Sequence, residues 1–302
     1  MTTIICAGMI TVDFVYDLPG YPQEGSKTRA AASRMVAGGG ALIAAAAVAR
    51  LGGHAMLAGA IGNDALGDFL RGELRRLSID GRLVESLDGV ETSRSAIFVT
   101  ERGERTIVNH RDARLFDHSP DHRAILNCDA VLTDTRWERG ATALLGAAAR
   151  ADKPAIVDAE APLDVAGDAL DLATHIVFSE QGLADFSAVP AADAIRDAVK
   201  RYSAWTAVTR GARPVLYLEG NAVREASTLP VEAVDTLGAG DVWHGAFALH
   251  LASGRSEREA VGYANAAAAV MVSRAVSCGV SISGAGRYPT QADIEAMVAG
   301  SA

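Results

Sequence analysis

The chain has 302 residues, of which 49% are apolar and 22% charged, so its composition is that of a folded globular protein. Its net charge of −9 argues against a nucleic-acid partner, because proteins that bind a phosphate backbone usually present a basic surface. No apolar run reaches the roughly 18 residues that a membrane-spanning helix needs, so we also expect no membrane partner.

Short apolar or β-branched runs alternate along the chain with longer helical patterns. This alternation predicts an α/β fold, in which helices flank a mostly parallel central sheet. No long linker divides the sequence, and we expect a single domain over residues 1–302. The predicted strands are Ile4–Ile10, Ala55–Ile61, Ala130–Asp134, Ala155–Asp158, His175–Ser179, Thr206–Thr209 and Val215–Glu219. The predicted helices are Ala41–Leu51, Ala65–Leu77, Gly140–Arg150, Ala191–Tyr202, Val242–Ala252, Glu257–Ser273 and Gln291–Val298.

Two segments, residues 12–35 and 93–110, do not fit the alternation. The first combines prolines and glycines with short extended pieces. The second is typical of a hairpin, with strands at Ser95–Thr100 and Arg105–His110 and a turn at residues 101–104. We expect both segments to form a small antiparallel β lid beside the main sheet. The alternative is that they are surface loops without a role.

A run of small residues precedes the helix predicted at Val242–Ala252. Gly238, Ala239 and Gly240 lead directly into Asp241. The first backbone N–H groups of a helix have no partner and lie at the positive end of its dipole, so this turn predicts a phosphate site. A carboxylate would repel the phosphate there unless it has a task. We therefore predict that Asp241 accepts the proton of an attacking hydroxyl group, while the alternative is that it only caps the helix.

The full string from Asp235 to Asp241, Asp-Thr-Leu-Gly-Ala-Gly-Asp, resembles the second signature of the ribokinase/PfkB family of sugar kinases. Three glycines at 38–40, followed by an alanine-rich helix, resemble its first signature. The resemblance implies a ribokinase-like fold, ATP and Mg²⁺ as cofactors, Asp241 as the base and Gly238–Gly240 as the anion hole. It also allows K⁺ near Asp235 and a homodimer formed through the lid.

The same resemblance implies further site residues. On the sugar side these are Asp13, Gly38, Gly39 and Gly40; on the nucleotide side they are Ser179, Thr209, Gly211 and Asn265. The family often has an asparagine in the helix after the glycines, where this chain has Ile43 or an apolar neighbour. Its magnesium-organising Asn-X-X-Glu motif appears here as Ser179-Glu180-Gln181-Gly182. Glu180 is therefore expected to act on the metal through water.

Three residues bear on the choice of sugar: Lys27, Asn109 and Arg136. Positive side chains facing the sugar would predict an anionic group on it, although each alone could be a solvated surface charge. With their surroundings they resemble bacterial sulfofructose kinase, which implies 6-deoxy-6-sulfofructose as acceptor, phosphorylated on a primary hydroxyl. His110 and Arg111 follow Asn109 and add potential positive charge. The alternatives are a neutral ketohexose, a 2-keto-3-deoxy sugar acid, ribose, or a non-catalytic sugar-binding sensor.

The cysteines and the N-terminus bear on localisation. Cys6, Cys128 and Cys278 are odd in number and far apart, which favours free thiols in a reducing compartment. The N-terminus carries no basic leader before its first apolar run. We therefore expect a cytoplasmic protein.

Overall fold

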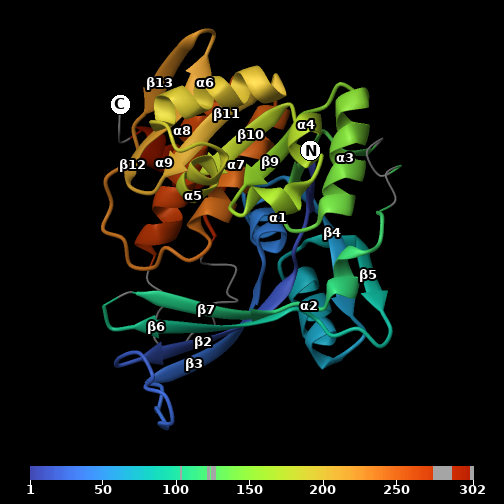
Figure 1. Cartoon of the computed structure of the whole chain (residues 1–302), viewed down its shortest axis with the longest axis vertical. Coiled ribbons are helices and arrows are strands. Elements are labelled where there is room, and N and C mark those ends of the chain that lie inside the picture. Colours follow the sequence, from blue (N-terminus) through green and yellow to red (C-terminus); the bar gives the residue numbers. More distant parts are fainter. Residues whose placement is uncertain (103, 121–122, 124–126, 275–287, 300–302) are drawn as a thin grey trace.

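The computed structural model describes residues 1–102, 104–120, 123, 127–274 and 288–299, and Figure 1 shows its arrangement. In these residues nine strands form the central sheet, in the order β13-β12-β11-β10-β9-β8-β1-β4-β5. Pairing is parallel from β5 through to β11 and antiparallel from β11 to β13. The strands are β1 (Thr3–Ala7), β4 (His54–Gly62), β5 (Asp80–Leu87), β8 (Ala130–Thr133), β9 (Ala155–Ala159), β10 (His175–Ser179), β11 (Trp205–Arg210), β12 (Arg213–Glu219) and β13 (Ala222–Ala226).

Helices cover both faces of this sheet and create two cores. Successive side chains of β1 point to opposite faces of the sheet. Ile4 and Cys6 therefore pack into one core, and Ile5 and Ala7 pack into the other. The first core is closed by α1 (Gly40–Arg50), α2 (Ala65–Arg76), α7 (Ala239–Ala252), α8 (Glu257–Ser273) and α9 (Gln291–Ala299). The second is closed by α3 (Glu138–Arg150), α4 (Ala169–Leu172), α5 (Glu180–Phe186) and α6 (Ala191–Tyr202). Short 3₁₀ turns η1 (Ala113–Phe116) and η3 (Leu163–Ala166) complete the described elements.

A second, four-stranded sheet projects from the larger body and corresponds to the predicted lid (Figure 1). Its order is β3 (Ala32–Gly38), β2 (Thr11–Leu18), β6 (Arg94–Thr100) and β7 (Arg105–His110). The prediction of an antiparallel lid is wrong in one respect, because β2 and β6 pair in parallel. Parallel neighbours need a long crossover, and the chain supplies one through α1, β4, α2 and β5. The lid is therefore a mixed sheet.

Sequence periodicity missed the edge strands β5 and β13 and the helices α4 and α5. The two strands are polar and partly exposed, and the two helices have only four and seven residues. The predicted lid turn includes residue 103, which lies outside the described residues, as does Cys278. Cys6 and Cys128 are both buried. Among the described residues, no helix combines the length and apolar character required to cross a membrane.

Candidate active site

The turn before α7 has the backbone that its sequence predicts. Gly238 adopts a φ of +77°, a left-handed conformation that favours glycine, and serves as the N-cap of α7. The carboxylate of Asp235 supports the turn by accepting a hydrogen bond from the N–H of Leu237 at 2.9 Å. The first-turn amides of α7 have no carbonyl partner four residues earlier in the helix. The N–H of Ala239 donates to the Thr236 carbonyl oxygen at 3.3 Å, so the N–H groups of Gly240 and Asp241 are the ones available to an anion.

The start of α7 meets the start of α1 at a cavity of about 400 Å³. Its wall also includes the ends of β8 and β9 and the inner side of the lid. Ligands of α/β folds bind at the carboxyl ends of parallel strands, which is where this cavity lies. The sequence-predicted residues that line it are Asp13, Gly39, Gly40, Asn109, Arg136, Ser179, Thr209, Gly238, Gly240 and Asp241.

The Asp241 carboxylate lies against the first residue of α1. A Cβ atom on Gly40 would stand 2.9 Å from Oδ1 of Asp241, so glycine is what lets the two helices converge here. Burial, followed by the nearby carboxylates of Glu160, Asp134 and Asp13, raises the pKa of Asp241 to about 7. A carboxyl group with this pKa can accept a proton near neutral pH and release it again.

Asp13 lies on lid strand β2 and also lines the cavity. It is 7% exposed; burial raises its pKa to about 6, while a hydrogen bond with Ser95 acts in the opposite direction. Gly38 makes room for it, since a Cβ atom there would stand 2.0 Å from Oδ2 of Asp13. The side-chain amide of Asn109 donates to Ser95 Oγ at 2.9 Å. Strands β6 and β7 of the lid therefore hold Asp13 in place.

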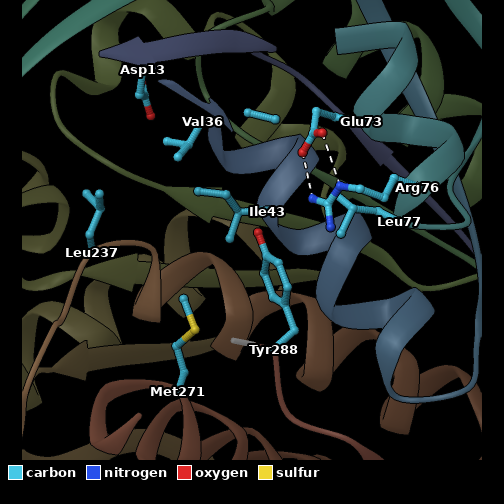
Figure 2. A pocket seen from close by; sticks show the side chains of 10 residues that line it. Asp13, Val36, Ile43, Glu73, Arg76, Leu77, Leu237, Met271 and Tyr288 are labelled. Carbon is cyan, nitrogen blue, oxygen red and sulfur yellow. Dashed lines mark hydrogen bonds and ion pairs between the residues drawn. The ribbon is translucent and has the colours of Figure 1, made fainter. Parts of the chain in front are cut away.

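A second cavity, of about 20 Å³, adjoins Asp13 and is large enough for about one water molecule (Figure 2). Its wall is mostly apolar and includes Val36, Ile43 and Leu237, with the ion pair of Glu73 and Arg76 at one side. Ile43 lines both cavities. Ile43, one of the apolar residues expected where the family has its asparagine, therefore faces the larger cavity.

Arg111 and Arg136 bring two guanidinium groups to the larger cavity. Arg136 donates to the Glu160 carboxylate at 3.3 Å. Arg111 donates from Nε to Oδ1 of Asn109, and burial followed by the charge of Arg136 lowers its pKa. Lys27 is exposed in the loop between β2 and β3 and does not line the cavity. Arg111 therefore lines the cavity, whereas Lys27 does not.

Two aspartates that the sequence did not single out lie at strand ends in this cavity. Asp134 follows β8 and accepts hydrogen bonds from the N–H groups of Met9 at 2.7 Å and Arg136 at 2.9 Å. Asp158 lies near the end of β9, and its Oδ1 accepts no hydrogen bond from any described residue. Burial, then the carboxylates of Glu160, Asp241 and Asp134, raises the pKa of Asp158 well above its usual range. Acidic residues at the carboxyl ends of predicted parallel strands were the available sequence signal.

His244 lies one turn after Asp241 and contacts both Asp158 and the anion-binding turn. Its Nδ1 is 2.8 Å from the carbonyl oxygen of Gly240 and 3.4 Å from Oδ2 of Asp158. Burial lowers the pKa of His244 to about 4, so the imidazole is neutral at pH 7. It therefore acts as a hydrogen-bonding support and adds no positive charge to the cavity.

The predicted nucleotide-side residues divide into two groups. Ser179 caps α5 by accepting a hydrogen bond from the N–H of Gly182 at 3.0 Å, and it lines the cavity with Thr209. Gly211 has a φ of +62° in the exposed turn between β11 and β12. Asn265 is buried in α8, where Oδ1 accepts from Trp243 Nε1 at 2.8 Å and Nδ2 donates to the Ser227 carbonyl at 3.0 Å. Neither Gly211 nor Asn265 lines the cavity.

The two residues predicted to act on metal ions already have protein partners. Glu180 is exposed, forms an ion pair with Arg213 and lies outside the cavity wall. A Cβ atom on Gly182 would stand 2.0 Å from the Ala159 carbonyl oxygen, so this position has no room for a glutamate. Asp235 accepts a hydrogen bond from Arg105 at 3.3 Å, and a monovalent cation beside it stays a prediction.

Three comparisons relate this architecture to known proteins. The sequence profile of the family described as pfkB family carbohydrate kinase matches residues 1–281. A ribokinase of Bacillus subtilis is 26% identical over 304 aligned positions, which cover 99% of this chain and 100% of that protein.

Solved structures agree with the profile. The crystal structure of a ribokinase-like protein from Agrobacterium tumefaciens superposes with a TM-score of 0.91 and 32% identity, covering 99% of this chain and 98% of that one. The structure of Arabidopsis thaliana ribokinase complexed with ribose and ATP superposes with a TM-score of 0.80 and 20% identity, covering 98% of both chains.

Proposed function

This chain belongs to the pfkB family of carbohydrate kinases, and we propose that it transfers the γ-phosphoryl group of ATP to a primary hydroxyl group of a sugar, with Asp241 as the base. The observation that carries the proposal is the position of Asp241. Its carboxylate lies where α1 and α7 begin, in the wall of the large cavity, and has a pKa of about 7. This is the place and the proton affinity that activation of a hydroxyl group requires.

The chemistry needs one proton transfer and one phosphoryl transfer. The sugar hydroxyl gives its proton to Asp241 as its oxygen forms a bond to the γ-phosphorus. The bond from that phosphorus to the bridging oxygen breaks, and ADP leaves with the electron pair. Backbone amides at the start of α7 stabilise the negative charge on the transferring group.

Magnesium bound with ATP would neutralise part of the charge on its phosphates. The cavity offers oxygen ligands of the kind that this ion prefers, on Asp158 and Glu160. Among the described residues, no group of three or more His, Cys, Asp or Glu side chains is placed to hold a metal alone. The phosphates and water would therefore complete its coordination.

The lid would form the sugar side of the site. Asp13, Ser95 and Asn109 reach the cavity from three lid strands and can hydrogen-bond sugar hydroxyls. Closure of such a lid excludes water, which would otherwise compete with the sugar as acceptor. The homodimer through the lid stays a prediction, to which the exposed Val108 on the edge strand β7 lends an apolar side chain.

The acceptor that the comparisons support is a neutral sugar, ribose or a ketohexose, because a ribokinase and a ketohexokinase are among the relatives. The cavity is compatible with this choice. Arg136 is engaged by Glu160 and Arg111 by Asn109, and Lys27 lies outside the wall. The two guanidinium groups in the cavity wall therefore already have protein partners.

A second candidate acceptor is an anionic ketose such as 6-deoxy-6-sulfofructose. One observation favours it: Arg111 and Arg136 lie close enough for the charge of Arg136 to lower the pKa of Arg111. Paired guanidinium groups of this kind suit a sulfonate, carboxylate or phosphate. A 2-keto-3-deoxy sugar acid would satisfy the same pair.

A coupled ADP-release assay with ATP and Mg²⁺ tests the function. The acceptors are ribose, fructose, fructose 6-phosphate, 6-deoxy-6-sulfofructose and 2-keto-3-deoxygluconate. We expect the highest kcat/KM with a neutral sugar, and a KM change below about threefold in Arg111→Ala. Preference for an anionic sugar, reduced by about tenfold or more in Arg111→Ala and Arg136→Ala, would establish the second candidate. ADP release with none of these sugars would contradict the kinase and favour a sugar sensor.

A further inference from the structure

The large cavity has more acidic than basic side chains for a site that must admit a triphosphate. Its wall carries five carboxylates and two guanidinium groups, on Asp13, Asp134, Asp158, Glu160, Asp241, Arg111 and Arg136. Since His244 is neutral, it does not offset the difference. Like charges in a confined site repel strongly. ATP therefore needs a cation between its phosphates and this wall.

The residues that family likeness suggests for this task are not placed to perform it. Glu180 is paired with Arg213 outside the cavity wall. Position 182, the last of the family's Asn-X-X-Glu motif, packs against the Ala159 carbonyl with no room for a side chain. The metal contact must come from another element of the fold.

Among the carboxylates of the cavity, only Asp158 has a fully buried oxygen atom that lacks a hydrogen-bond partner in the described part of the chain. The residue is 7% exposed, yet its Oδ1 accepts no hydrogen bond from any described residue. Such a buried acceptor is costly unless it has a partner. Its other oxygen, Oδ2, lies 3.4 Å from Nδ1 of His244, which can orient the carboxylate. In contrast, both oxygens of Asp134 accept backbone hydrogen bonds.

We propose that Asp158, assisted by Glu160, forms the protein side of the magnesium site in this chain, in place of Glu180 and of the missing glutamate at position 182. The inference rests on the proposed kinase function, because the phosphates of the nucleotide complete the site. Magnesium commonly takes one or two carboxylates together with phosphate oxygens and water. Glu160 follows β9 two residues after Asp158, and its side chain is 53% exposed, so it can reach the ion through water.

The test is the effect of Mg²⁺ on ADP binding, measured by calorimetry without turnover. We expect MgCl₂ to strengthen ADP binding to the wild type, and Asp158→Asn to reduce this strengthening by about tenfold or more. Glu160→Gln should reduce it by a smaller factor. Glu180→Gln should leave it unchanged, and so should Asp13→Asn, which removes one carboxylate from the cavity wall without touching the proposed site. A thermal melt of each variant checks that the fold is retained.

Each outcome decides the proposal. An unchanged Mg²⁺ effect in Asp158→Asn, or its loss in Glu180→Gln, would overturn the assignment of Asp158 while leaving the kinase intact. An equal loss in Asp13→Asn would show that only total charge matters, which also overturns the site. ADP binding that is absent from the wild type with and without Mg²⁺ would refute the proposed function itself.

Discussion

Gly40 and Asp241 meet where two helices begin, with 2.9 Å between Oδ1 of Asp241 and the place that a Cβ atom on Gly40 would take. One residue opens α1 and the other lies in the first turn of α7. The positive ends of both helix dipoles therefore point at one small volume. A carboxylate with a pKa of about 7 lies in that volume, although the dipoles favour its ionised form.

Gly40→Ala should impair catalysis more than stability. The new methyl group would displace the Asp241 carboxylate, and we expect kcat to fall by about tenfold to a hundredfold. Gly262→Ala on α8 is the matched control, because its Cβ would meet nothing within 4 Å. That control should keep full activity and gain roughly 0.5–1 kcal/mol of stability. Wild-type kcat in Gly40→Ala would show that the contact is not needed.

The pH dependence should follow Asp241. Only the ionised carboxylate can accept the hydroxyl proton, and its pKa is about 7. We therefore expect kcat/KM to fall about tenfold per pH unit below that value. A profile measured from pH 5 to pH 9 with saturating ATP checks this. A kcat/KM that stays constant down to pH 5 would exclude Asp241 as the base, or exclude the raised pKa.

Arg105 should affect sugar binding through the lid. Its guanidinium group, on β7, donates to Thr236 Oγ1 at 2.7 Å and to Asp235 at 3.3 Å, which ties the lid to the turn before α7. We expect Arg105→Met to raise the KM for the sugar by roughly 2–10-fold. Arg94→Met, which removes only a surface ion pair with Glu91, is the control and should leave KM unchanged. Equal KM values in the two variants would argue against a contribution of these lid hydrogen bonds to sugar binding.

Asn265 should contribute to stability and not to nucleotide binding. Its amide links Trp243 on α7 to the carbonyl of Ser227, an exposed residue, and Asn265→Ala would leave the buried indole N–H of Trp243 without its partner. We expect a loss of about 1–3 kcal/mol in the free energy of unfolding, measured with urea. The KM for ATP should change by less than about threefold in the variant that remains folded at 25 °C. A stable variant with a much higher KM for ATP would instead support the nucleotide role predicted from sequence.

The sequence predicted the centre of the site better than its rim. The small residues before Asp241 predict a helix N-terminus that is open to an anion, and α7 begins there in the structure. Asp13 and Asn109 also reach the cavity as predicted. These residues belong to elements whose local patterns determine where their side chains lie.

The remaining residues depend on long-range packing that no local pattern reports. Whether Lys27 reaches the sugar depends on the path of an irregular loop, which here keeps it exposed. Parallel pairing of β2 with β6 joins strands separated by a long crossover, so the hairpin pattern could not predict it. Asp134 and Asp158 come together only because β8 and β9 are neighbours in the sheet.

The most direct test compares ADP release by the wild type and by Asp241→Asn with the best sugar at pH 8. We expect kcat of the variant to fall by about 10²–10⁴-fold. The melting temperature at pH 8 should be no lower than that of the wild type. The native pKa of about 7 exceeds the ordinary aspartate value of 3.8, so the ionised carboxylate opposes folding above pH 7. A folded Asp241→Asn variant with kcat within about tenfold of the wild type would contradict the assignment of Asp241 as the catalytic base.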